Sequence, residues 1–150
     1  PYSGVLLDLL ANRGRTWPLF ASDDTHYYDG TDEATAAIYL HADALTRESF
    51  VRAVKQKDFY AAVSRTSDSP VTDRPGPEVH LLREGDRIRL LCTPARKISF
   101  FSNLSWCPDR VLYGDGLTGA VYTVKPQEKY LRAEVTTADG LVAYSNYLTF

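Results

Sequence analysis

A carboxylate and an imidazole stand two positions apart near the N-terminus, at Asp24 and His26. The residues before them, 16–22, are apolar at their centre and predict a buried strand. Residues i and i+2 of a strand point to the same face, so these two side chains would reach one point. Carboxylate oxygen and imidazole nitrogen both bind divalent metals. The spacing therefore predicts Asp24 and His26 as metal ligands, and the alternative is a polar turn at the surface.

The composition is that of an ordinary soluble protein. Of the 150 residues, 44% are hydrophobic and 24% are charged, and the net charge is −2. This balance, without any run of Lys and Arg, predicts no nucleic-acid partner. No apolar stretch approaches the ~18 residues that cross a bilayer, so we expect no membrane partner. The chain begins at Pro1, almost inside a helical pattern, which suggests a fragment or a processed piece.

Residues 1–64 alternate helical and extended patterns, which is typical of an α/β arrangement. The spacing of residues 5–10 predicts a helix that ends at Asn12-Arg13-Gly14. A second helix is predicted from an N-cap at Thr46 to about residue 57, with an apolar stripe at Phe50, Val51 and Val54. Strands are predicted at residues 16–22, 34–42 and 59–64.

The remaining residues divide into a linker and a β-rich domain. Residues 65–77 are polar, contain three prolines and predict a linker or long loop. From residue 78 onward, apolar and polar residues alternate in short runs, and Ala138-Asp139-Gly140 is typical of a hairpin turn. This pattern predicts an immunoglobulin-like antiparallel β-sandwich at 78–150. Its strands are expected near 79–83, 86–93, 97–103, 110–113, 119–124, 129–137 and 141–149.

Two groups of side chains in the sandwich allow more than one interpretation. Cys92 and Cys107 could form a disulfide, but two buried free thiols are the favoured interpretation. The second group is Trp106, Tyr113, Tyr122 and Tyr144, which could bind sugars or a protein if they are exposed, although packing is the commoner use of aromatic residues.

Several short motifs, taken in their order, resemble the last part of a PHP (polymerase and histidinol phosphatase) domain. The resemblance is closest to the subgroup of predicted metal-dependent phosphoesterases with an appended β domain. The matching motifs are a helix at 5–10, Gly14-Arg15, a strand at 17–21, Asp24-Thr25-His26, the spaced residues Thr46, Phe50, Ala53 and 58–61, Gly76-Pro77, and the segments 130–135 and 143–146.

The resemblance implies that residues 1–64 are the C-terminal βα units of a (β/α)7 barrel holding divalent Mn, Fe or Zn. Asp24 and His26 match the late Asp-x-His ligands of that family. The early His-x-His motif has no counterpart, because the chain has only His26, His41 and His80. A phosphorylated small molecule would be the substrate of the complete barrel.

Two functions follow as hypotheses. The first is the C-terminal portion of a phosphoesterase, inactive as this chain alone because other metal ligands are missing. The alternative is a non-catalytic β-sandwich module that binds carbohydrate or protein. Exposed apolar surface on residues 1–64 is expected to pack against the sandwich or a second chain.

Overall fold

The computed structural model describes residues 3–26, 33–64 and 77–150. Two α-helices, one 3-10 helix and eight strands follow one another within these ranges. The N-terminal half contains α1 (Gly4–Asn12), β1 (Ala36–Leu40), α2 (Arg47–Gln56) and β2 (Phe59–Ser64). The remaining elements are β3 (Val79–Glu84), β4 (Arg87–Ser102), η1 (Pro108–Arg110), β5 (Val111–Thr123), β6 (Tyr130–Thr136), β7 (Leu141–Ser145) and β8 (Leu148–Thr149).

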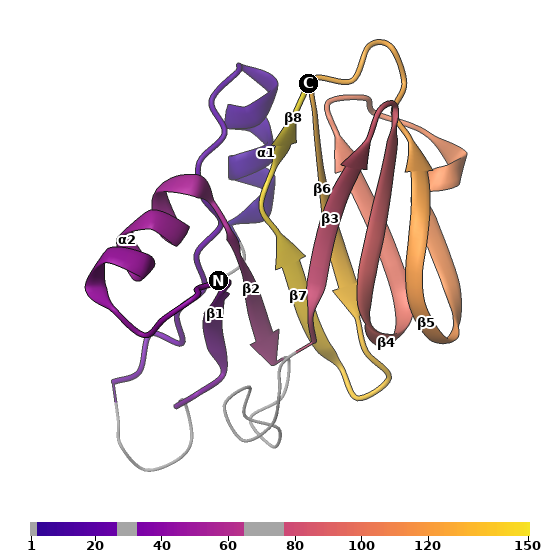
Figure 1. Cartoon of the computed structure of the whole chain (residues 1–150). Coiled ribbons are helices and arrows are strands. Elements are labelled where there is room, and N and C mark those ends of the chain that lie inside the picture. The colour runs from indigo at the N-terminus through magenta and orange to yellow at the C-terminus, as the bar shows by residue number, and fades with distance from the viewer. Residues whose placement is uncertain (1–2, 27–32, 65–76) are drawn as a thin grey trace.

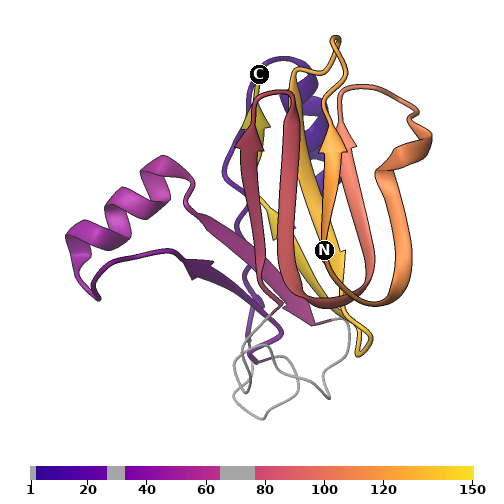
Figure 2. The ribbon, with the colours of Figure 1, turned by 45° about the vertical axis from the view of Figure 1, so that its right-hand side comes forward.

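All eight strands belong to one antiparallel sheet that curls into a half-barrel (Figures 1 and 2). Its order is β1-β2-β7-β6-β4-β3, with β5 also paired to β4 and β8 to β6. The curl arises largely in β4, which pairs with β3 through residues 87–92 and with β6 through residues 97–102. The register of β4 against β5 shifts on both sides of Ala95, and such irregularities bend a strand.

The expected fold class, PHP-type (β/α)7 barrel units followed by a separate immunoglobulin-like sandwich, is therefore wrong. A barrel of βα units needs parallel strands, whereas β1 and β2 pair antiparallel. β2 also pairs with β7 and so continues directly into the C-terminal sheet. The predicted division at 1–64, 65–77 and 78–150 stays a prediction, and residues 65–76 lie outside the described part of the chain.

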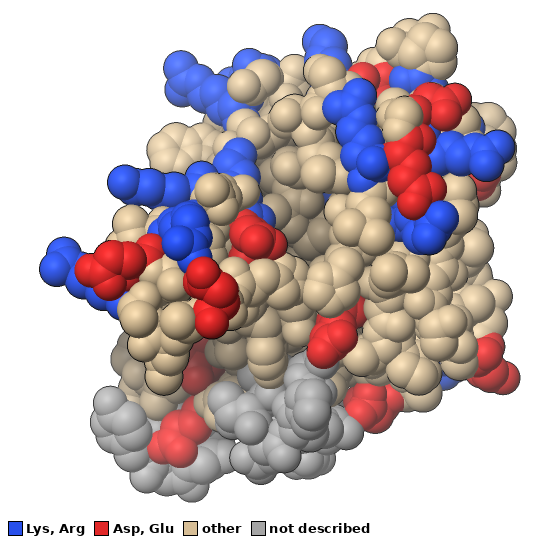
Figure 3. All heavy atoms as spheres, in the orientation of Figure 1, with Lys and Arg blue, Asp and Glu red and all other residues tan. Residues whose placement is uncertain are grey.

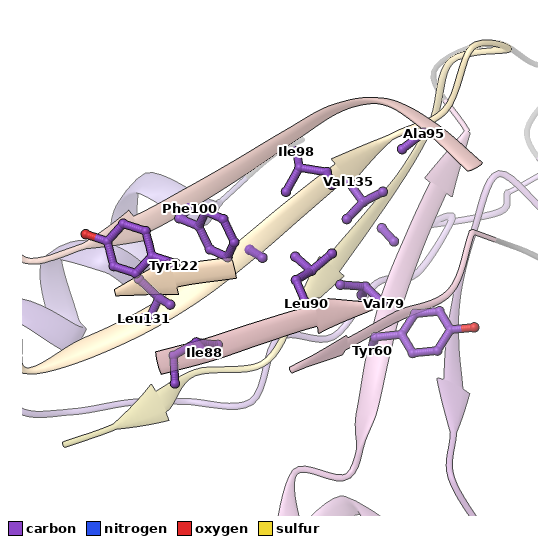
Figure 4. Packing of buried hydrophobic residues seen from close by; sticks show 12 residues of the cluster. Tyr60, Val79, Ile88, Leu90, Ala95, Ile98, Phe100, Tyr122, Leu131 and Val135 are labelled. Carbon is purple, nitrogen blue, oxygen red and sulfur yellow. The ribbon is translucent and has the colours of Figure 1, made fainter. Parts of the chain in front are cut away.

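The main core fills the concave side of the curled sheet. Twelve buried residues meet there, including Ile88, Leu90, Ile98, Phe100 and Val135 (Figure 4). They come from strands on both sides of the bend, so the sheet buries its own inner face without a second sheet. A smaller cluster lies under α1, where Ala11 and Leu19 pack with Tyr130 and Tyr147.

Several local predictions are confirmed. α1 ends before Gly14, whose φ of +79° suits a helix C-terminus. The N-cap of α2 is Thr46, which accepts a hydrogen bond from the Ser49 N–H. The hairpin between β6 and β7 turns at Gly140, where φ is +87°. Cys92 and Cys107 are free thiols, each partly buried.

Neither α1 nor α2, the two α-helices of the described ranges, is long and apolar enough to cross a membrane.

Candidate functional site

The segment that carries Asp24 is held in place without being a strand. Residues 15–26 belong to no strand, so the strand expected at 16–22 is wrong. Pro18 has no N–H to donate to a strand ladder. The Leu19 N–H instead donates to Asn146 Oδ1 at 2.8 Å, and Leu19 itself is buried. Side-chain contacts, rather than sheet pairing, therefore fix this segment.

The backbone at Asp24 removes the geometric basis of the predicted ligand pair. Asp24 has φ +59°, a left-handed conformation that Asp tolerates better than most residues. Side chains two positions apart share a face only in extended backbone, so the strand argument does not apply to Asp24 and His26. Their role as ligands stays a prediction. His26 is the last residue before the undescribed stretch 27–32.

Asp23 and Asp24 occupy different environments. Asp23 Oδ2 accepts a hydrogen bond from the Ala34 N–H at 2.7 Å, and this bond is the main cause of the lowered pKa of the Asp23 carboxyl. Asp23 thus ties the segment to the residues that lead into β1. The Asp24 N–H makes a long contact with Ser22 Oγ, at 3.5 Å, within the same segment.

Both carboxylates line a groove of about 340 Å³ between α1 and the sheet. One wall is formed by Gly4 and Leu7 of α1 together with Phe20, and the floor includes Ala61 and Tyr144 of β2 and β7. Phe20 also packs on Phe59, with ring centroids 4.9 Å apart. The groove is therefore lined by both apolar side chains and carboxylates.

The described residues do not fit a complete divalent-metal site. They include no group of three or more His, Cys, Asp or Glu side chains able to hold an ion. Tetrahedral zinc sites use four protein ligands, or three ligands and a water, so two would not suffice. The expected Mn, Fe or Zn therefore finds no full ligand set within residues 3–26, 33–64 and 77–150.

A second hollow, of about 490 Å³, is lined by two histidines for which the sequence analysis predicts no role, His41 and His80. The His41 and His80 rings stack with their centroids 4.6 Å apart. His41 Nδ1 lies 2.7 Å from Asp58 Oδ1, and His80 Nε2 lies 3.7 Å from Glu78 Oε2. This contact joins the end of β1 to β3. No sequence signal could have predicted it, because β1 and β3 lie at opposite ends of the strand order and only the curl of the sheet brings the two residues together.

The N-terminal half exposes several large apolar side chains. On α1, Val5, Leu6 and Leu9 are 66%, 60% and 54% exposed. Trp17 and Phe20 follow with 58% and 55%. These five residues are called the α1 surface below. Residues 1–64 thus expose apolar surface, and the expected packing of that surface against the sandwich or a second chain stays a prediction.

The apolar stripe expected to bury α2 is wrong. Phe50 and Val51 are exposed, while Ser49 and Ala53 are the buried residues of this helix. The helix therefore turns its small residues inward.

Lys and Arg are interspersed with Asp and Glu over the face shown in Figure 3, so this face has no extended area of one charge.

The aromatic residues of the C-terminal half divide between the core and the surface. Trp106 and Tyr113 are 77% and 73% exposed, whereas Tyr122 is buried. Lys97 Nζ lies 5.6 Å from the Tyr113 ring centroid, so one face of that ring is already occupied by a cation.

Comparison of the chain with family models, curated proteins and solved structures found no match.

Proposed function

We propose that this chain is a non-catalytic interaction module that binds a protein partner on the α1 surface. The exposure of Val5, Leu6 and Leu9 carries this proposal. Positions i, i+1 and i+4 of a helix share one side, so these residues form a stripe on the outer side of α1. Exposed apolar stripes of this kind are typical of protein docking surfaces.

The inner side of α1 is firmly attached, which makes its outer side a pre-formed surface. Asp8 accepts hydrogen bonds from Arg132 and from the Tyr147 hydroxyl, the latter at 2.9 Å. Ala11 is buried against Tyr130 and Tyr147. The exposed apolar stripe therefore lies on the outer side of a helix whose inner side is already packed against the sheet. A rigid surface loses little entropy on binding, which favours affinity.

The chemistry of this surface favours protein over carbohydrate. Aliphatic side chains such as Val5 and Leu6 gain free energy by burial against apolar partner groups. Sugar binding relies on exposed aromatic rings, and the candidates for it, Trp106 and Tyr113, lie in the C-terminal half. Trp17 and Phe20 supply the aromatic anchors that commonly dominate protein interfaces.

Selection of binders from a displayed library of protein fragments of the source organism tests the proposal. Leu6→Glu and Leu9→Glu are expected to weaken the selected binders at least about ten-fold, because each places a charge in the contact. Arg13→Glu, an exposed change just beyond α1, is the matched control and should leave binding unchanged. Binders insensitive to both substitutions, or glycan-array binding that Trp106→Ala abolishes, would contradict the proposal.

A second proposal names the partner that would bind the α1 surface. It is motivated by Asp24, which lines the groove beside α1. In it, the chain contributes Asp24 and His26 to a PHP-type phosphoesterase, and the α1 surface packs against the barrel that supplies the remaining ligands. No hydrolytic step is assigned to the described residues, since they hold no complete ligand set.

Metal analysis and a generic phosphate monoester separate the two proposals. The phosphoesterase proposal expects no tight metal and no hydrolysis for the chain alone. It expects both to appear when a selected partner is added, and to disappear with Asp24→Ala or His26→Ala. A partner that binds the α1 surface without metal uptake or hydrolysis favours the non-catalytic module.

A further inference from the structure

Strand β1 forms one end of the eight-stranded sheet (Figure 1). It pairs with β2 on one side, in an unbroken register from Ala36↔Val63 to Leu40↔Phe59. No described strand pairs with its other side. An edge strand of this kind offers a row of main-chain donors and acceptors to another strand.

The register identifies which main-chain groups face outward. The Ser64 N–H donates to the Thr35 carbonyl, and the His41 N–H donates to the Asp58 carbonyl. Odd-numbered residues of β1 therefore form the hydrogen-bonded pairs with β2. Because antiparallel pairs alternate, the N–H and C=O groups of Ala36, Ile38 and Leu40 point away from β2.

β1 lacks several of the sequence features by which proteins usually protect a sheet edge. Its sequence, Ala-Ala-Ile-Tyr-Leu, contains no charged residue and no proline. Its ladder with β2 contains no bulge. Natural edges are normally blocked by Lys, Pro, bulges or inward charges. The absence of all four in β1 marks this edge as suited to pairing.

We infer that β1 pairs antiparallel with β1 of a second copy of this chain, on a two-fold axis through Ile38. This register places all five residues of each strand opposite each other. Ala36 then faces Leu40 of the partner subunit, and Ala37 faces Tyr39 of the partner subunit, so a small residue meets a large one on each sheet face. Ile38 meets its own copy at the axis.

The main-chain groups fit the same register. Pairs of Ala36 with Leu40 and of Ile38 with itself are the ones whose N–H and C=O groups face outward, so each becomes a hydrogen-bonded pair. Registers displaced by two residues leave part of each strand unpaired. A two-fold, self-complementary contact is the commonest form of homodimer. This inference concerns β1 and does not depend on a partner at the α1 surface.

Sedimentation equilibrium over a concentration series tests the association. We expect a monomer–dimer equilibrium in the unmodified chain. Ile38→Pro removes the donor at the axis and is tolerated by the fold, because the Ile38 N–H faces away from β2. It should raise the dimer dissociation constant at least about ten-fold. Ile38→Val, which keeps the donor, is the matched control and should dimerise like the unmodified chain.

Cysteine cross-linking tests the register and keeps the inference falsifiable if Ile38→Pro fails to fold. In a Cys92→Ser/Cys107→Ser background, Ile38→Cys places two thiols on opposite residues about 5.5 Å apart at Cα, within disulfide range. Ala36→Cys places its thiols four residues apart along the strands, roughly 13 Å, and should not cross-link.

Three outcomes would overturn the inference. One is a monomer throughout the concentration series. Another is a dimer that the folded Ile38→Pro variant leaves unchanged. The third is equal cross-linking of Ile38→Cys and Ala36→Cys. If the dimer forms through the α1 surface instead, Leu6→Glu would abolish it while Ile38→Pro would not.

Discussion

The guanidinium of Arg132 holds the carboxylate of Asp8 through two hydrogen bonds, 2.7 Å from Nε to Oδ1 and 2.6 Å from Nη2 to Oδ2. Arg132 is 1% exposed and also lies 4.1 Å from the Phe101 ring centroid. Burial alone would lower the pKa of Arg132, but its bonds to Asp8 and Glu134 outweigh that effect and raise it. This pair attaches α1, and with it the proposed docking surface, to the centre of the sheet.

Asp8→Ala is expected to destabilise the fold by about 3–5 kcal/mol, because it leaves a buried guanidinium with one carboxylate fewer. Urea unfolding measures the change. Glu84→Ala, which removes an ion pair with the half-exposed Arg89, is the matched control and should cost less than about 1 kcal/mol. An Asp8→Ala/Arg132→Leu double variant should recover much of the stability that Asp8→Ala loses. A double variant as unstable as Asp8→Ala would contradict the explanation.

Asn146→Ala should loosen the segment that leads to Asp24. The Asn146 side chain accepts from the Leu19 N–H and donates to the carbonyls of Phe59 and Lys57, at 2.7 and 3.3 Å. Its removal leaves the buried Leu19 N–H and Phe59 carbonyl without their partner, at about 1–3 kcal/mol each. Amide hydrogen exchange should show faster exchange at Leu19. Asn103→Ala, a distant control, should not change it, and unchanged exchange in Asn146→Ala would contradict the role given to Asn146.

Glu128 should make stability depend on pH in the acid range. Its burial opposes ionisation, yet hydrogen bonds from Ser102, the Lys125 N–H, Tyr122 and Arg110 win and lower its pKa. A carboxyl with a lowered pKa contributes its stability above its unfolded value, near pH 4.3, and loses it as the pH falls through the folded value.

Glu128→Gln should accordingly be less stable than the unmodified chain at pH 7, by about 2 kcal/mol. The difference should shrink as the pH falls below the folded pKa. Thermal or urea unfolding across a pH series measures it. A difference that stays constant with pH would show that lost packing, rather than lost charge, is responsible.

Cys92 should react slowly with thiol reagents. Burial raises the pKa of its thiol to about 11, and its Sγ lies 3.5 Å from the Leu117 carbonyl oxygen. The thiolate is the reactive form, so a shift of about two pH units lowers its population at pH 8 roughly a hundred-fold.

Labelling of a Cys107→Ser variant isolates Cys92 and should be slow in the folded protein and fast in urea. The proton held by the folded thiol also means that stability falls as the pH rises from the unfolded pKa towards 11. Fast labelling of Cys92 in folded protein would contradict the burial that causes the shift.

Much of the local structure could be predicted from the sequence, because it depends on neighbours along the chain. The ends of α1 and α2 follow from Gly14 and Thr46, and the β6–β7 hairpin follows from Asp139-Gly140. The strand at 16–22 was wrong because Asn146, remote in sequence, supplies the partner that a strand would have needed.

The arrangement of the sheet could not be predicted in the same way. Alternating residues show that a strand has one buried face but not which strand lies beside it. The sequence therefore did not distinguish two sheets from one curled sheet bent near Ala95. The same limit applies to the candidate site, since pairing of β2 with β7 brings Ala61 and Tyr144 beneath Asp24.

The pairing of β2 with β7 also bears on how the protein is made. Tyr60 lies opposite Ser145 in that ladder, so β2 finds this neighbour only after β7 has been synthesised. Until then β2 lacks its pairing with β7, and Asp8 of α1 lacks its ion pair with Arg132. Folding of the N-terminal half is therefore completed after its own synthesis, once β6 and β7 have left the ribosome.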